Sequence, residues 1–353
     1  MSLNANLLFV LILSFILLPL LFWAFRNLPK ENWQVLACVP GEKSRGETRR
    51  GTNYTWYGFF LATAYVSGVL VFLTLMGSIA APKEAMFVLI VIVLAICTPL
   101  AAILARLVEG KRFTLTVGGA VFAGLMLAPW IIWILNATLG GVFGFRFPVL
   151  ATLCAMAIAH VLGEGMGRLA CISFGCCYGK PLRKLPKFFR KLLLPFGMTF
   201  FGKTKKIAYA HGLDGQPVVP VQAMTSILYV AVSLCCIWLF LEESYVVCFA
   251  IAAGVSHGWR IVSEFLRADY RGKKRFSAYQ IMSLSALPYA AALIFLFPPS
   301  PVGRTSIAAG LASFWSPEII LFLQVLWFII FLFAGRSHVT AAEISLYVVK
   351  NRI

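Results

Sequence analysis

The stretch AHVLGEGMGRLA, residues 159–170, places a histidine, a glutamate and an arginine among residues that are otherwise apolar or small. The surrounding run from Pro148 to Leu169 is long enough for one membrane-spanning helix, because a hydrocarbon core about 30 Å thick needs about 20 apolar residues. A charge at the bilayer centre costs about 2.5–3.5 kcal/mol on insertion scales, so such charges usually face a polar interior. This stretch therefore predicts a membrane helix with one polar face.

Similar apolar runs follow one another along the whole chain. Hydrophobic residues make up 60% of the 353 positions and charged residues 12%, whereas soluble domains carry about 25% charged residues. We therefore expect an all-α integral membrane protein, a polytopic bundle of about eight transmembrane helices. The other expected spans are Ala5 to Phe25, Tyr57 to Ala80, Met86 to Ala105, Leu115 to Leu135, Val221 to Leu241, Tyr245 to Phe265, Ala278 to Phe297 and Ile319 to Ala334.

The domain organisation follows from the first of these runs. It lacks a basic leader and a small-residue cleavage site, so it is interpreted as a retained anchor rather than a cleaved signal peptide. We expect residues 1–55 to form an amino-terminal anchor helix and basic loop, and residues 56–353 to form one membrane domain.

The net charge of +18 lies mainly in the connections between the apolar runs. It indicates an anionic lipid as partner and no nucleic acid, since there is no soluble basic domain. The longest polar connection, from Gly179 to Pro220, contains LRKLPKFFRKLLLPFGMTFF (182–201), which mixes basic residues with Leu and Phe. That mixture is typical of a segment lying in the head-group layer, although an ordinary basic cytoplasmic loop is an equally open reading.

Two apolar runs carry charges spaced for one helical face. At 100° per residue, each set falls within about 80° of arc. Each set also places an acid one turn from a base, which permits two ion pairs that lock helices together. The alternative is a shared polar cavity in which arginines bind a phosphate and the acids hold the guanidinium groups in place. The sets are His160, Glu164 and Arg168, and His257, Arg260, Glu264 and Arg267.

The cysteines do not form a recognisable metal motif. Cys171, Cys176 and Cys177 cluster, but they lack the paired spacings and the second ligand pair of a zinc site. We expect no metal and no other cofactor. Thiols inside the apolar runs behave as small hydrophobes: Cys97, Cys154, Cys235, Cys236 and Cys248.

Several segments between Trp56 and Leu284 resemble, in order, the conserved blocks of bacterial prolipoprotein diacylglyceryl transferases. MGRLACISFGCCYGKPL (166–182) is similar to the family signature GRxGNFxNGExxGR. The other similar segments are TWYGFFLA (55–62), FTLTVGGAVFAGL (113–125), PVQAMTS (220–226), WRIVSEFLRADYRG (259–272) and FSAYQIMSL (276–284).

This resemblance implies a transferase of the bacterial cytoplasmic (inner) membrane that acts in lipoprotein biosynthesis. The family moves the diacylglyceryl group of phosphatidylglycerol to the lipobox cysteine of a prolipoprotein, forming a thioether and releasing glycerol phosphate. The implied partners are phosphatidylglycerol, the prolipoprotein signal peptide and membrane lipids. Matching positions assign catalysis to Tyr57, Arg168, Arg260 and Glu264, and substrate binding to Gly179 and Arg267, to which the polar faces add His160, Glu164 and His257.

The chain departs from the family pattern at several polar positions. Family histidines fall at Val117 and Val219, and signature polar residues fall at Cys171, Phe174 and Cys176. His160 or His257 would then handle the proton of the reaction. The departures keep two alternatives open, which are a paralogue with a different acceptor and a non-enzymatic carrier of anionic lipid. The basic loop before Tyr57 favours a cytoplasmic location, whereas the resemblance implies the outer leaflet.

Overall fold

The computed structural model describes residues 4–43, 48–110, 117–269, 276–299 and 304–353. Nine helices of these ranges are long and apolar enough to cross a membrane, which confirms the polytopic helical class and corresponds to the nine apolar runs expected to be spans. The expected start at Leu115 lies outside the described residues. The nine are α1 Ala5–Asn27, α2 Trp56–Ser78, α3 Lys83–Glu109, α4 Val117–Thr138, α6 Val149–Phe174, α9 Val221–Leu241, α10 Tyr245–Leu266, α11 Ala278–Leu296 and α13 Pro317–Gly335.

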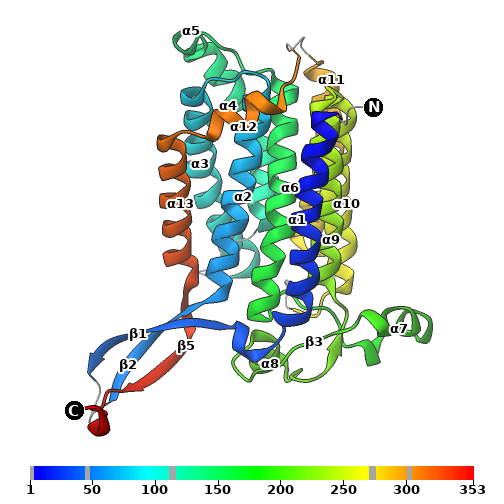
Figure 1. Ribbon diagram of the computed structural model, residues 1–353. Helices are drawn as coiled ribbons and strands as arrows, with labels where there is room; N and C mark the ends of the chain where they lie inside the picture. The colour runs from blue at the N-terminus through cyan, green and yellow to red at the C-terminus, as the bar shows by residue number, and fades with distance from the viewer. Residues whose placement is uncertain (1–3, 44–47, 111–116, 270–275, 300–303) are drawn as a thin grey trace.

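Helix α6 is the centre of the bundle, packed against α2 on one side and α9 on the other (Figure 1). Small residues allow these close contacts: a Cβ added at Gly163 would lie 3.4 Å from the Ala64 carbonyl of α2. A Cβ added at Gly165 would lie 3.1 Å from the Tyr229 Cβ of α9. The glycines around Glu164 therefore bring three backbones together at the level of the charged residues.

Helices α1 and α13 lie at the outside of the bundle and expose large apolar side chains. Phe15 is 81% exposed and Phe333 is 73% exposed. Such surfaces are suited to lipid rather than water. The exposed apolar area is therefore consistent with the membrane location that the composition indicates.

A small sheet, which the sequence did not predict, joins the connection between α1 and α2 to the segment that follows α13. Its antiparallel order is β1 (Val35–Lys43), β2 (Thr48–Thr55) and β5 (Arg336–Ser345). Thr52 pairs with Val39 on one side and with Ala341 on the other. The described parts of the basic loop before α2 thus contain two paired strands, and β2 also pairs with the distant strand β5.

One end of the bundle collects the polar segments. The sheet, α7 (Lys187–Leu193) and α8 (Lys206–His211) lie at the end where α2 begins and α6 finishes (Figure 1). A two-stranded pair, β3 (Met198–Thr199) with β4 (Pro217–Val218), belongs to the same connection. At the opposite end, the short helices α5 (Gly140–Phe143) and α12 (Ile307–Phe314) cover the connections.

Helix α7 has the character expected of a basic interfacial segment. Phe188 is 74% exposed and Leu192 is 57% exposed, beside Lys187, Arg190 and Lys191. Exposed aromatic and aliphatic residues next to lysine and arginine suit the boundary between acyl chains and head groups. The connection between α6 and α9 therefore presents a surface that is both apolar and basic.

Candidate functional site

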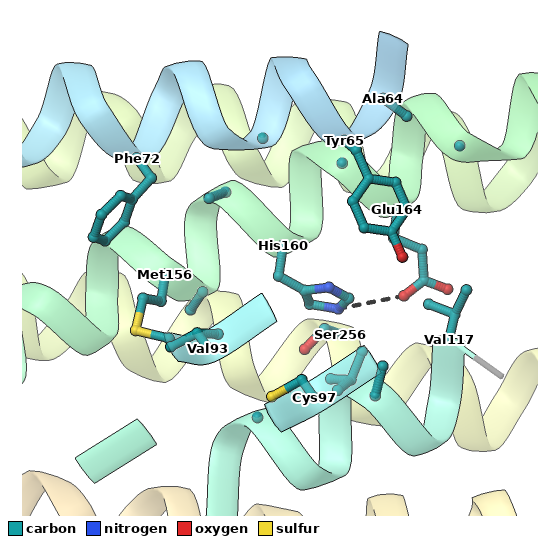
Figure 2. A pocket seen from close by; sticks show the side chains of 18 of the residues that line it. Ala64, Tyr65, Phe72, Val93, Cys97, Val117, Met156, His160, Glu164 and Ser256 are labelled. Atoms are coloured by element: carbon teal, nitrogen blue, oxygen red, sulfur yellow. Dashed lines mark ion pairs between the residues drawn. The ribbon is translucent and has the colours of Figure 1, made fainter. Parts of the chain in front are cut away.

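Glu164 is the centre of a charged cluster in the middle of the bundle. Its carboxylate accepts hydrogen bonds from Arg260 Nη2, at 2.8 Å to Oε1 and 2.7 Å to Oε2. Arg168 of the same helix donates to Oε1, and His160 Nε2 lies 3.3 Å from Oε2 (Figure 2). One carboxylate is therefore shared by two guanidinium groups and an imidazole.

The cluster depends on two helices and a glycine. His160, Glu164 and Arg168 recur every four residues on α6 and therefore share a face, as predicted. Arg260 comes from α10, which packs against α6. A Cβ at Gly118 of α4 would lie 2.9 Å from Arg260 Nη1, so the glycine leaves room for the guanidinium group.

The charges of the cluster do not cancel. Glu164 is 7% exposed and Arg260 is 9% exposed, and two arginines face one carboxylate. Removing one partner of a buried ion pair typically costs about 3–5 kcal/mol, because it leaves an uncompensated charge. The excess positive charge favours an anion in this part of the bundle.

A pocket of about 360 Å³ opens beside the cluster, between α2, α3, α4, α6 and α10. Phe72, Val93 and Met156 line one end, whereas His160 and Glu164 lie toward the other (Figure 2). An apolar cavity with a few convergent polar groups is the usual form of a small-molecule site. The combination is suited to an amphipathic ligand with an anionic head group.

Three buried polar atoms at the pocket form no hydrogen bond within the part of the chain that the structure describes. These are Arg168 Nε, His257 Nδ1 and His160 Nε2, the last of which is ion-paired with Glu164, and all three residues line the pocket. Buried polar groups in proteins nearly always form hydrogen bonds. These side-chain nitrogens are therefore available to form hydrogen bonds with a ligand in the pocket.

Tyr57 also lines the pocket, near the end of α6. It lies in the first turn of α2, and its ring contacts the ring of Phe174 with centroids 5.7 Å apart. Its position at the polar end is compatible with contact to a head group.

The second predicted charged face divides. Glu264 Oε1 lies 3.7 Å from Arg267 Nη1, one turn beyond the pair that Arg260 makes with Glu164. Arg267 also donates two hydrogen bonds of 2.8 Å to the carboxylate of Asp269. Arg267 lies just beyond the end of α10. His257 lines the pocket, whereas Arg260, Glu264 and Arg267 are not among its lining residues. The four predicted residues thus contribute to two neighbouring clusters rather than to one face of the cavity.

Gly179 belongs to the backbone that joins the end of α6 to the end of α10. It pairs with Arg267 in an isolated bridge, flanked by a 2.9 Å bond from Lys180 N to Leu266 O. A side chain at this position would overlap Val219. Gly179 therefore permits a close backbone approach and lies outside the pocket lining.

The two valines at family histidine positions have different surroundings. Val117 begins α4 and lines the pocket close to Glu164 (Figure 2). Val219 is fully buried with Leu182 and Val221 in a small apolar cluster. Val117 thus gives the pocket an apolar side chain where the resemblance implies a polar one. Val219 is instead part of a small buried apolar cluster.

The sequence analysis assigned no separate role to Lys205, a lysine of the connection between α6 and α9. Lys205 is fully buried, and its Nζ donates to Ser173 O at 2.5 Å and Leu28 O at 3.2 Å. Burial lowers the pKa of Lys205 to about 8. The lysine thus satisfies a carbonyl at the end of α6, a role visible only after folding.

Sequence reasoning also missed Ser256 and Gly118. Ser256 lines the pocket beside His257, and Gly118 packs against Arg260. The position of Ser256 next to a histidine on an otherwise apolar helix was the available signal. The signal for Gly118 was its place in the glycine pair that follows Val117.

The fold and the pocket define a multi-pass integral membrane protein with an apolar pocket beside a buried cluster of two arginines and one glutamate. The chain belongs to the prolipoprotein diacylglyceryl transferase family, whose model matches residues 49–296. It is similar to the phosphatidylglycerol–prolipoprotein diacylglyceryl transferase of Clostridium tetani, with 30% identity over 144 residues, or 39% of this chain and 50% of the relative. The chain thus spans about half the length of the curated relative it matches.

Proposed function

We propose that the protein transfers the diacylglyceryl group of phosphatidylglycerol to the lipobox cysteine of an exported prolipoprotein. In this reaction the cysteine sulfur forms a bond to the glyceryl carbon, and the bond from that carbon to the phosphate oxygen breaks. Glycerol phosphate leaves with the electron pair of the broken bond, and the thiol releases one proton. The proposal places the protein in the cytoplasmic membrane of a bacterium.

The observation that carries the proposal is the position of the Glu164 cluster at one end of the apolar pocket. Acyl chains would lie among residues such as Phe72 and Met156, with the phosphate near Arg168 and Arg260. A charged group and an apolar tail are thereby bound by opposite ends of one cavity. The open Arg168 Nε is suited to donate to a phosphate oxygen.

In this proposal Arg168 and Arg260 stabilise the negative charge that develops on the departing phosphate. Glu164 orients both guanidinium groups, since it accepts hydrogen bonds from each of them. Tyr57 contacts the head group from α2. Glu264, Arg267 and Gly179 act as positioning residues, because they hold the ends of α6 and α10 together outside the pocket.

His160 and His257 are the candidates for receiving the thiol proton. Both line the pocket, and His160 Nε2 lies 3.3 Å from Glu164. His257 Nδ1 is unpartnered among the described residues and therefore open to a substrate atom.

A second candidate function is transfer of the same lipid group to a different acceptor. Val117 favours this candidate, because an apolar side chain lines the pocket at a position where the resemblance to the family implies a histidine. A changed acceptor would require a different proton route at this edge of the pocket. The lipid-binding end of the site would be the same in both candidates.

Complementation of a bacterial strain depleted of its own diacylglyceryl transferase tests the proposal. We expect the wild-type protein to restore growth and to add the mass of a diacylglyceryl group to lipoproteins, with glycerol phosphate released from phosphatidylglycerol in vitro. Release without lipoprotein modification would support the different acceptor. No release by well-expressed, folded protein would contradict both candidates and leave the lipid carrier.

A further inference from the structure

Three cysteine side chains converge where α6 ends. The sulfur atoms of Cys171, Cys176 and Cys177 all lie within 4.8 Å of one another. The chain reverses at Gly175, which has a φ of +68°, and Cys176 N donates to Cys171 O at 3.0 Å. The helix cap thus folds the last two thiols back onto the final turn of the helix.

This spacing is compatible with a single metal ion. Zinc–thiolate bonds are about 2.3 Å long, so three sulfurs around one ion are separated by about 4 Å. The three thiols already interact with one another through their side chains. Side-chain rotations alone could therefore bring them into coordination distance without moving the backbone.

The surrounding charges favour the metal-bound form. Three thiolates and one divalent ion carry a net charge of −1. Arg168 interacts electrostatically with Cys171 and Cys177, and Arg267 does so with Cys177. These cations lower the cost of an anionic metal–thiolate centre in a buried position.

A metal ion binds cysteine in its thiolate form. A divalent ion would displace three protons to form the three thiolates. Soft sulfur ligands select zinc or cadmium over magnesium or calcium.

We propose that Cys171, Cys176 and Cys177 form a binding site for one thiophilic divalent cation of the zinc class. The sequence spacing gives no zinc motif, and the site arises from the turn at Gly175. Cys171 also lines the lipid pocket, so a fourth coordination position would be accessible from the pocket. The proposal does not depend on the transfer reaction.

Cadmium titration of the reduced, metal-stripped full-length protein in detergent tests the site. We expect one equivalent of Cd²⁺ to produce an ultraviolet sulfur-to-metal charge-transfer band that Zn²⁺ removes and Mg²⁺ does not. Loss of an outer-shell partner typically weakens metal binding about 10- to 100-fold. We expect a larger loss of Cd²⁺ affinity in each of the variants Cys171→Ser, Cys176→Ser and Cys177→Ser. Cys235→Ser, which changes an exposed cysteine on α9, should bind like the wild type.

A measurement on the wild type covers the case in which serine variants fail to fold. Zn²⁺ should slow alkylation of Cys177 by N-ethylmaleimide at least tenfold, read by mass spectrometry of the 171–177 peptide, and leave Cys235 unaffected. Equal alkylation of Cys177 with and without Zn²⁺ would overturn the proposal. It would also be overturned by a cadmium band that persists in all three folded serine variants.

Discussion

Glu164 of α6 and Arg260 of α10 are joined by hydrogen bonds of 2.7 and 2.8 Å, although 96 residues separate them in the chain. Arg168 donates to the same carboxylate. A single acid thus sets the positions of two arginines from different helices. The geometry of the charged end of the pocket depends on this residue more than on any other.

We expect Glu164→Gln to destabilise the protein by about 3–5 kcal/mol, because both buried arginines lose their counter-charge. Thermal unfolding in detergent measures the change. Glu84→Gln, at an exposed position in the first turn of α3, should leave the unfolding temperature unchanged. Equal unfolding temperatures for both variants would contradict the assigned role of Glu164.

Arg168→Ala should weaken binding of phosphatidylglycerol about 10- to 100-fold, since a hydrogen bond to a charged group contributes about 1.5–3 kcal/mol. Binding to nanodiscs with and without phosphatidylglycerol provides the measurement. The matched control is Arg146→Ala, an exposed arginine in the connection between α5 and α6. If Arg168→Ala binds anionic lipid as well as wild type does, the phosphate-binding role is wrong.

His160→Ala should lower kcat for diacylglyceryl transfer about 10²- to 10⁴-fold, the usual contribution of a proton-transferring side chain. The KM for lipid should change less, because the arginines remain. His257→Ala is tested alongside it, since both histidines line the pocket. Full activity in both variants would exclude a histidine from the proton transfer.

Gly118→Ala should lower transfer activity, because the added Cβ would lie 2.9 Å from Arg260 Nη1 and 3.0 Å from the Tyr279 ring. The guanidinium group would have to move away from Glu164. Gly254→Ala on α10 is the control, since its Cβ would have no heavy atom within 4 Å and the residue does not line the pocket. Similar rates of glycerol phosphate release in the two variants would argue against this packing constraint.

Lys205 should make stability depend on pH. Its pKa is lowered to about 8 from the ordinary 10.5, so between these values the unfolded chain binds a proton that the folded chain has released. Stability therefore rises as pH increases through this window, by up to about 3 kcal/mol at 1.4 kcal/mol per pKa unit.

Unfolding temperatures at pH 7.5 and pH 9.5 measure this effect. We expect the rise in the wild type and in Lys203→Met, an exposed lysine of the same connection, and a smaller rise in Lys205→Met. An identical rise in Lys205→Met would assign the effect to other groups.

The helices and the two charged faces could be predicted from local sequence. A run of about 20 apolar residues can satisfy its backbone in a bilayer only as a helix, so span positions follow from hydropathy alone. Spacing by four places His160, Glu164 and Arg168 on one face wherever the helix packs. The prediction of a polar interior at this helix was therefore possible without tertiary information.

The remaining features depend on contacts between distant segments. The sequence could not show that Arg260 pairs with Glu164 of α6, because the relative rotation of α6 and α10 decides this partner. The burial of Lys205 cannot be predicted from local sequence, because the carbonyl groups that accept its hydrogen bonds lie at the ends of α1 and α6. Strand β2 (Thr48–Thr55) pairs with strand β5, which lies almost 300 residues further along the chain.

What the sequence by itself determined is thus the membrane bundle, since apolar length and helical periodicity are local properties of the chain. Tertiary structure alone decided which arginines share Glu164 and where the pocket lies beside them. The physical reason is that an ion pair or a cavity wall requires atoms from several helices. Their packing is set by the small residues and side-chain shapes along every contact, rather than by any one segment.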